Sequence, residues 1–213
     1  MRLIYHYFIW ETPVSNRITH YQCFQAEFME VEGDFSREWV SIPQGVSGSV
    51  DVEIVDMPYE SAEYSMMAIR YSGNYFGDLA DIEDYVADKG ILSVRQLLKE
   101  FPTAITFPKF RMEYDRDLNE IFTRDTGLGI VFSPRANYSG FANALYISNI
   151  IHKAVIEVTE EGTVASGASA GNFIQRGVAS KMRFNVPFVF YIYHSCDGLV
   201  LFQGRYAYPT AEE

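Results

Sequence analysis

The segment that most limits how this chain can fold is residues 188–193, FVFYIY, in which every side chain is apolar or aromatic. A strand with one buried face would alternate apolar and polar residues, so this segment predicts a strand that is covered on both sides. Residues 199–202, LVLF, have the same character, and Asp197-Gly198 between the two segments is a typical turn pair. Because the chain has few helical segments to cover these strands, we expect another chain, or a further part of the protein, to pack there.

The rest of the chain is rich in strand-like segments. Val50, Val52 and Ile54 alternate with acidic residues, which is the period of a half-buried strand. By composition and pattern, further strands are expected at residues 3–10, 24–31, 64–69, 103–110, 145–158, 183–193 and 199–206. The predicted fold class is therefore α+β, with antiparallel or mixed sheets and few helices.

Three short helices are expected. Residues 78–88 carry Leu79, Ile82 and Val86 at helical spacing. Residues 93–100 place Val94, Leu97 and Leu98 on one face, with Ser93 and Gln96 as a capping box. The third helix is marked by Leu118, Ile121 and Phe122.

The bulk properties limit the function classes. With 213 residues, 48% of them hydrophobic and 15% aromatic, one domain with a substantial core is expected. The 17 basic and 28 acidic residues give a net charge of −11, which disfavours nucleic acid as a partner. The sequence contains no polybasic run that would bind an anionic membrane, and no apolar run long enough to span a bilayer.

Several local features bear on compartment and modification. The apolar start of the chain is broken by His6 and lacks a small-residue cleavage site, which predicts a strand and not a signal peptide. An extracellular location is expected if an N-terminal part precedes this chain, and a cytoplasmic one otherwise. Cys23 and Cys196 would permit one disulfide but form no metal motif. Asn137 begins a sequon that would carry a glycan in a secreted protein.

Residues 160–177, EEGTVASGASAGNFIQRG, form a run of small side chains between two strand-like segments. On composition alone, such a run is typical of a flexible linker. It also contains G-x-S-x-G, the nucleophile elbow of α/β-hydrolases, centred on Ser169. The elbow requires a helix directly after it and an acid followed by a histidine downstream. Here residues 171–177 are a poor helix and His194 precedes Asp197, so the hydrolase interpretation is disfavoured.

The same region carries a resemblance to a known family. HKAVIEVTEEGT (residues 152–163), FNVPFVFYI (184–192) and LVLFQGRYAYP (199–209) resemble the C-terminal signature of the serpins. FPKF (107–110), VFSPRANYSG (131–140), VDMPYES (55–61) and IYHYFIWETPV (4–14) fit the same family in the same order. The resemblance implies a partial serpin fold, in which residues 1–213 form a single serpin domain truncated at the N-terminus.

In serpins, the run of small residues is the hinge and first half of the reactive-centre loop, which the resemblance places at about residues 160–183. A protease cuts this loop, and the loop then inserts as a new strand into the large sheet. Small side chains suit a strand that slides between two others. The implied hinge residues are Glu160, Glu161, Gly162, Thr163, Val164, Ala165, Ser166, Gly167 and Ala168.

The family's spacing also implies the position of the cleaved bond, between Arg176 and Gly177. Arginine fits the anionic primary pocket of a trypsin-like protease, and Phe173, Ile174 and Gln175 would occupy neighbouring subsites. Without the resemblance, Arg176 would be interpreted as an ordinary solvated loop residue.

Two further residues match positions of the family motif. Lys109 corresponds to the lysine that pairs with the hinge glutamate, here Glu160, where the loop enters the sheet. His152 corresponds to the histidine in the region of the sheet that opens during insertion, although its usual partners lie in N-terminal helices that have no counterpart here.

The resemblance implies a serine protease inhibitor that acts as a suicide substrate, and not an enzyme. A non-inhibitory serpin that serves as a protease substrate or binding module is the alternative. The expected partner is a trypsin-like serine protease, together with a second chain or self-association at the apolar strands. No metal or cofactor is implied.

Overall fold

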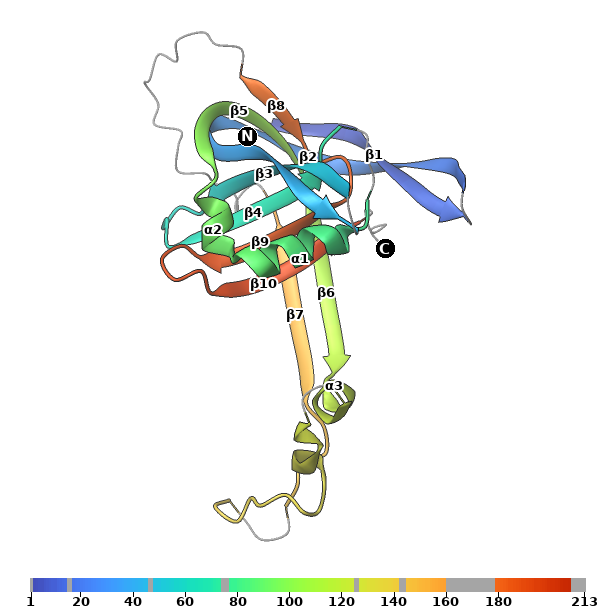
Figure 1. Ribbon diagram of the computed structural model, residues 1–213, viewed down its shortest axis with the longest axis vertical. Helices are drawn as coiled ribbons and strands as arrows, with labels where there is room; N and C mark the ends of the chain where they lie inside the picture. The colour runs from blue at the N-terminus through green and yellow to red at the C-terminus, as the bar shows by residue number, and fades with distance from the viewer. Residues whose placement is uncertain are drawn as a thin grey trace. The chain divides into compact units, whose positions relative to one another are not determined.

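The computed structural model describes residues 2–14, 17–45, 48–73, 77–124, 127–141, 145–159 and 179–207 (Figure 1). By its contacts the chain divides into two compact units, Met1–Phe110 with Val158–Glu213, and Arg111–Glu157. Each unit is considered by itself below. That the two units belong to one domain stays a prediction.

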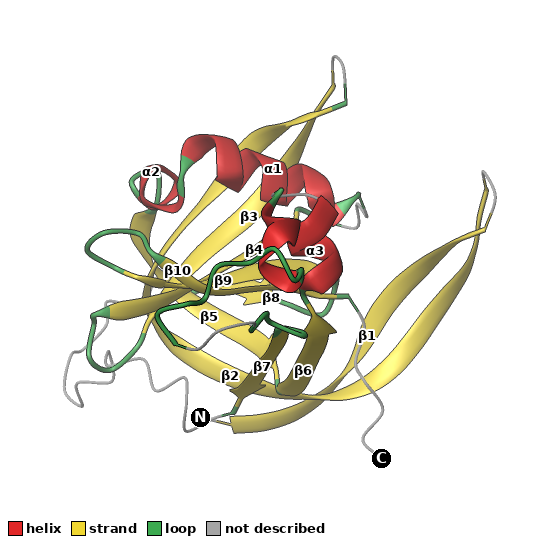
Figure 2. Cartoon of the chain, turned by 90° about the horizontal axis from the view of Figure 1, so that it is seen from below, coloured by secondary structure: helices red, strands yellow, loops and turns green. Residues whose placement is uncertain are grey.

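The first unit is built on an eight-stranded mixed sheet. Its neighbours pair antiparallel except β5 and β8, which run parallel, as expected for the predicted α+β class. Figure 2 shows how strongly the sheet curves. In spatial order the strands are β10 (Val200–Tyr206), β9 (Phe188–His194), β4 (Tyr64–Tyr71), β3 (Gly48–Pro58), β2 (Arg17–Gln44), β5 (Lys99–Pro108) and β8 (Ser180–Arg183), while β1 (Arg2–Val14) pairs with β2.

Two helices, α1 (Leu79–Lys89) and α2 (Ile91–Arg95), cover one face of this sheet (Figure 2). The side chain of Asp78 caps α1 by accepting a hydrogen bond from the Ala80 amide over 2.9 Å. The three apolar residues that predicted α1 are all buried. They belong to one core cluster with three residues of β9, namely Val189, Tyr191 and Tyr193.

The opposite face of β9 packs against aromatic side chains from the same unit. The Phe110 and Tyr206 ring centroids are 4.7 Å apart, and those of Phe107 and Phe184 are 4.9 Å apart. Phe188 and Phe190 of β9 complete this aromatic cluster. Burial of β9 on both faces is thereby confirmed. Among the described residues, α1 and the aromatic cluster supply both layers over β9. The expectation that another chain, or a further part of the protein, packs at the apolar strands stays a prediction.

The second apolar segment has a different environment. β10 is an edge strand of the sheet. Four consecutive large side chains there are between 38% and 60% exposed: Leu199, Val200, Leu201 and Phe202. The described residues therefore leave apolar surface open at β10, and self-association through it stays a prediction.

The predicted helix at residues 93–100 was misplaced. The helix α2 begins at Ile91, after Gly90 with φ 78°, so Ser93 lies inside it and forms no capping box. The strand β5 already begins at Lys99. The chain reverses at Gly90, whose positive φ ends α1 at a position that apolar spacing does not reveal.

Two predicted strands were too long. Residues 183–193 are divided between β8, which ends at Arg183, and β9, which begins at Phe188. Residues 184–187 between them belong to neither strand. Pro187 has no backbone N–H to donate there. Of residues 145–158, only Ile151–Val158 forms a strand, β7.

A buried carboxyl group joins four elements of the first unit. Asp56 of β3 accepts hydrogen bonds from the hydroxyl groups of Ser65 and Tyr193, over 2.5 and 2.9 Å. Its other oxygen lies 3.2 Å from Nε of Arg95 in α2. Arg95 also donates to the carbonyl oxygen of Ser195. These bonds fasten α2 to β3, β4 and β9.

The second unit contains a two-stranded sheet of β6 (Phe110–Asp117) and β7 (Ile151–Val158). Between these strands the chain forms α3 (Asn119–Arg124), as predicted, and a short 3-10 helix, η1 (Leu128–Phe132). Within the residues that the structure describes, no helix combines the length and apolarity that a membrane crossing requires.

Candidate functional site

The segment that carries most of the predicted site joins β7 to β8. Residues 160–178 within it lie outside the described residues. The hinge, the subsites and the reactive bond therefore stay predictions: Glu160, Glu161, Gly162, Thr163, Val164, Ala165, Ser166, Gly167, Ala168, Phe173, Ile174, Gln175, Arg176 and Gly177. The structure does describe the two strands that lead into and out of this segment.

The entry strand β7 is largely exposed. Only its last residue, Val158, is buried. Charged side chains link β7 to β6: Lys153 lies 3.6 Å from Glu113, and Glu157 lies 3.8 Å from Arg111. The pKa of the Glu113 carboxyl group is lowered, first by a hydrogen bond from Arg111 and then by the charge of Lys153. Such exposed pairs set the local charge pattern and add little stability.

His152 lies on β7, in the strand that approaches the predicted hinge. Its ring centroid is 6.3 Å from that of Tyr114 on β6, and the side chain is exposed. The structure therefore places His152 beside the β6 strand. A role in opening a sheet stays a prediction.

The start of β7 is held by a residue that the sequence analysis did not single out. Asn119 at the beginning of α3 donates from Nδ2 to the Ser148 carbonyl oxygen over 2.9 Å and accepts from the Ile150 amide over 2.9 Å. The Leu118 amide also donates to the Ile150 carbonyl oxygen. No motif distinguishes Asn119, because its partners lie 29 and 31 residues further along the chain.

The exit strand β8 is built into the large sheet. Its four residues pair with Thr103–Thr106 of β5 in parallel register. Met182 and Phe184 are buried, and the Phe184 amide donates to the Thr106 carbonyl oxygen over 2.8 Å. The last four residues of the predicted loop span, 180–183, are thus a strand that anchors the end of the loop.

Lys109 follows β5 directly. Its backbone amide donates to the Glu27 carbonyl oxygen over 2.8 Å, and its Nζ lies 3.6 Å from the Glu27 carboxylate. Glu27 is therefore a described carboxylate partner of this lysine. The predicted pair with Glu160 stays a prediction, since Glu160 is outside the described residues.

The strand that contains residues 4–14 and the strand that leads into the hinge belong to different hydrogen-bonded sheets. β1 pairs antiparallel with β2 in the eight-stranded sheet, whereas β7 pairs with β6 in the two-stranded sheet. Among the described residues, no ladder joins β1 to β7.

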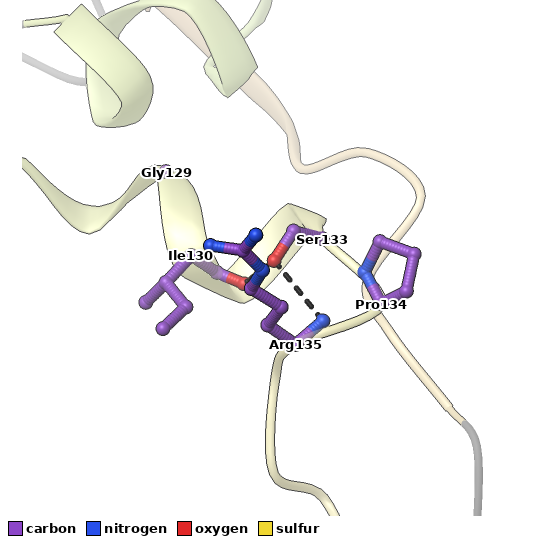
Figure 3. A pocket seen from close by; sticks show the side chains of 5 residues that line it. All are labelled: Gly129, Ile130, Ser133, Pro134 and Arg135. Carbon is purple, nitrogen blue, oxygen red and sulfur yellow. Dashed lines mark hydrogen bonds between the residues drawn. The ribbon is translucent and has the colours of Figure 1, made fainter.

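A surface pocket in the second unit lies at the end of η1 (Figure 3). The Arg135 amide donates to the Ser133 hydroxyl group over 3.3 Å at its rim. Arg135 is its one charged lining residue, which gives the pocket no acid-base pair. Nearby, Asn137 is exposed and accepts from the Ser139 amide over 3.2 Å, so a glycan at this position stays a prediction.

Metal and disulfide chemistry receive no support from the described side chains. Within the described ranges, no three His, Cys, Asp or Glu side chains gather as a metal site would require. Cys196 carries a free, exposed thiol. The side chain of Cys23 lies outside the described side chains.

Comparison with known proteins identifies the family. Residues 16–209 match the family model described as "Serpin (serine protease inhibitor)". This chain belongs to the serpin family. Among curated relatives, intracellular coagulation inhibitor 1 of Tachypleus tridentatus is 30% identical over 92% of this chain and 48% of its own length. Serpin B12 of Mus musculus is 32% identical over 78% of this chain and 41% of its own length.

The serpin fold is confirmed by a solved structure. The crystal structure of native protease nexin-1 with heparin matches with a TM-score of 0.71 and 25% sequence identity, covering 88% of this chain and 49% of that protein. The chain thus spans about half the length of the relatives it matches. The predicted partial serpin fold is confirmed by these findings.

Proposed function

We propose that this serpin presents residues 160–177 as bait to a trypsin-like serine protease, which cleaves between Arg176 and Gly177. The observation that supports the proposal is the position of the segment. It joins β7 to β8, and β8 is anchored by its pairing with β5. Intracellular coagulation inhibitor 1 and a further relative, the leukocyte elastase inhibitor of Sus scrofa, which is 29% identical over 78% of this chain, also favour a protease as the partner.

The chemistry follows that of a peptide substrate. The protease serine attacks the Arg176 carbonyl carbon, the bond to the Gly177 nitrogen breaks, and an acyl-enzyme on Arg176 results. Insertion of the loop before hydrolysis would trap this intermediate. Thr163, Ala165 and Gly167 alternate along the hinge, so their small side chains would share one face of the inserted strand.

A second candidate is a serpin that is cleaved but does not inhibit, acting as a substrate or binding module. The coverage of the relatives is the observation behind it: the chain spans about half of their length. Insertion stabilises the product only when a strand lies on each side of the inserted loop.

The first experiment tests the bait residue. The chain is exposed briefly to trypsin, and the products are identified by mass spectrometry. We expect the first cut after Arg176, and we expect Arg176→Gln to slow the first cleavage by more than about tenfold. Arg205→Gln is the matched control, because that residue is in a strand and binds Glu83 through two hydrogen bonds. An initial cut elsewhere, with Arg176–Gly177 intact, would overturn the proposal.

A further inference from the structure

Arg37 on β2 is a buried cation held between two aromatic rings. The residue is only 7% exposed. Its guanidinium carbon lies 4.4 Å from the centroid of the Trp39 ring and 5.3 Å from that of Phe101 on β5. Such stacking stabilises a guanidinium but supplies no acceptor for its N–H groups.

The carboxylates near Arg37 are committed to other groups. Glu53 of β3, directly opposite Trp39 in the ladder, binds Arg70 over 2.9 Å. Glu38 accepts a hydrogen bond from the Trp39 amide and lies 3.9 Å from Lys99.

One N–H group of the Arg37 guanidinium therefore has no acceptor. None of the hydrogen bonds and ion pairs found among the described side chains involves it, and its Nε is enclosed without a partner. A largely buried cation with an N–H group that lacks an acceptor would be stabilised by an anion placed against it.

The two rings that enclose Arg37 are open to solvent on their outer sides. Trp39 is 48% exposed and Phe101 is 38% exposed. The edge of β2 is also open here. The ladder to β5 ends at the pair of Arg37 with Lys99, whereas the ladder to β3 continues to Gln44. Beyond Arg37, the described residues provide no strand on the β5 side of β2.

The backbone at this edge can receive another strand. The Trp39 amide is satisfied by the side chain of its own neighbour, Glu38, over 3.1 Å. Pro43 lies further along the same stretch of β2. Proline has no backbone N–H to donate, and sheets tolerate it at their edges. A local side-chain bond of this kind is readily exchanged for a main-chain bond to an added strand.

We propose that Arg37, Trp39 and Phe101 form a receptor for a carboxylate side chain of a partner polypeptide that adds as a strand to the open edge of β2. We name these three residues the Arg37 site. The carboxylate would accept charge-assisted hydrogen bonds from the guanidinium, whose planar fork matches its two oxygens. Apolar side chains beside that carboxylate would cover the exposed rings.

A polypeptide fits the local charge better than a polyanion does. The chain carries a net charge of −11, and Glu38 and Asp51 lie on the neighbouring ladder positions. A nucleic acid or sulfated polysaccharide would be repelled over its length. A single carboxylate needs only the one guanidinium, and the backbone edge supplies the remaining contacts.

The experiment uses the fluorescence of Trp39. The chain has two tryptophans, so the Trp10→Phe variant leaves Trp39 as the single reporter. The probe is the acetylated and amidated peptide Val-Glu-Val-Phe-Val, with its glutamine counterpart as the neutral comparison. We expect a saturable change with the glutamate peptide, at least about tenfold weaker binding of the glutamine peptide, and loss of binding in Arg37→Met.

Lys99→Met is the matched control, because it removes a neighbouring cation without touching the stacked one. We expect it to weaken binding less than about threefold. The Arg37 Nε–H resonance, followed by NMR in the chain with native Arg37, should shift with the glutamate peptide. This readout remains decisive if Arg37→Met does not fold.

Four outcomes would overturn the proposal: equal binding of the two peptides, unchanged binding in folded Arg37→Met, tighter binding of inorganic phosphate or heparin than of the glutamate peptide, or no saturable response up to about 1 mM peptide.

Discussion

Tyr193 donates a hydrogen bond from its hydroxyl group to Oδ1 of Asp56 over 2.9 Å, between residues 137 positions apart in the sequence. The bond closes a network in which Ser65 and Arg95 bind the same carboxyl group. Burial raises the pKa of Asp56, and the hydrogen bonds from Ser65 and Tyr193 and the charge of Arg95 oppose that rise. The cost of removing the ionised carboxylate from water is larger than the stabilisation that its three partners give to the charge, so the net shift of the pKa is upward.

The raised pKa of Asp56 gives a pH dependence of stability with a definite sign. The folded state holds the proton on this carboxyl group more tightly than the unfolded state does. The contribution of Asp56 is therefore fully present below the ordinary aspartate pKa of 3.8 and is lost as the pH rises through its raised folded pKa.

We predict that the wild-type chain becomes more stable relative to Asp56→Asn as the pH is lowered from 7 towards 4. Urea unfolding of both proteins across this range measures the difference in unfolding free energy. Asp115→Asn, which changes an exposed carboxyl group, should show no such trend. A difference between wild type and Asp56→Asn that is flat with pH, or that shifts in favour of the variant on acidification, would contradict the prediction.

Gly204 of β10 has no room for a side chain. A Cβ at this position would lie 2.6 Å from Cζ of Phe190, whose ring is fixed within the aromatic cluster. We predict that Gly204→Ala lowers the free energy of unfolding by about 1–3 kcal/mol through overpacking. Gly140→Ala is the matched control, since a Cβ there meets nothing within 4 Å. Chemical denaturation of the two variants should separate them, and equal midpoints would refute the steric argument.

Phe188 is completely buried where β9 meets the aromatic cluster. Its ring centroid lies 5.1 Å from that of Phe107 and 5.2 Å from those of Phe184 and Tyr206. We predict that Phe188→Ala destabilises the chain by about 3–5 kcal/mol, because it removes a ring that several neighbours enclose. Phe202→Ala on the partly exposed β10 should cost much less. If Phe188→Ala and Phe202→Ala lowered the midpoint of thermal unfolding equally, Phe202 would have to be as well covered as Phe188, and the prediction would be wrong.

The elements that the sequence predicted well are those with local signals. Leu79, Ile82 and Val86 have helical spacing and all three are buried in α1. The turn at Asp197-Gly198 forms as expected, with Gly198 at φ 75° and its amide bound to the His194 carbonyl oxygen. The limits of α2 depended on the backbone conformation of Gly90, which residue spacing does not encode.

Long-range contacts account for what the sequence could not predict. The pattern of residues 188–193 indicated burial on both faces, but not that Phe107 and Tyr206 would provide one of the layers. In the candidate site, the role of Asn119 can be recognised only from its hydrogen bonds to Ser148 and Ile150, just before β7 begins. The bait residue, in contrast, follows from family spacing alone, because no described contact involves residues 160–178.

The last prediction concerns what cleavage at Arg176 does to the chain. We expect it to raise the midpoint of thermal unfolding only slightly, and we expect inhibition of the protease to be weak or absent. Insertion of a complete strand would form about a dozen sheet hydrogen bonds, worth on the order of 10 kcal/mol before the loss of entropy. That gain requires a strand on each side of the new one.

Among the described residues, no ladder contains both β1 and β7. β7 is paired with β6 in a two-stranded sheet, and β1 is paired with β2 in the large sheet. The expected obstacle is therefore the receiving sheet and not the loop, whose hinge side chains are small. Thermal unfolding before and after limited cleavage measures the stabilisation, and denaturing electrophoresis with trypsin detects a covalent complex.

Thr163→Arg separates the two explanations, because a bulky charged residue in the hinge blocks insertion without affecting the cut at Arg176. If insertion contributes little, the cleaved variant and the cleaved wild-type chain should unfold at similar temperatures, and neither should form a denaturation-resistant complex. A large rise in the midpoint together with a stable complex, both lost in Thr163→Arg, would show that a working sheet forms. The inhibitory function would then replace the substrate role.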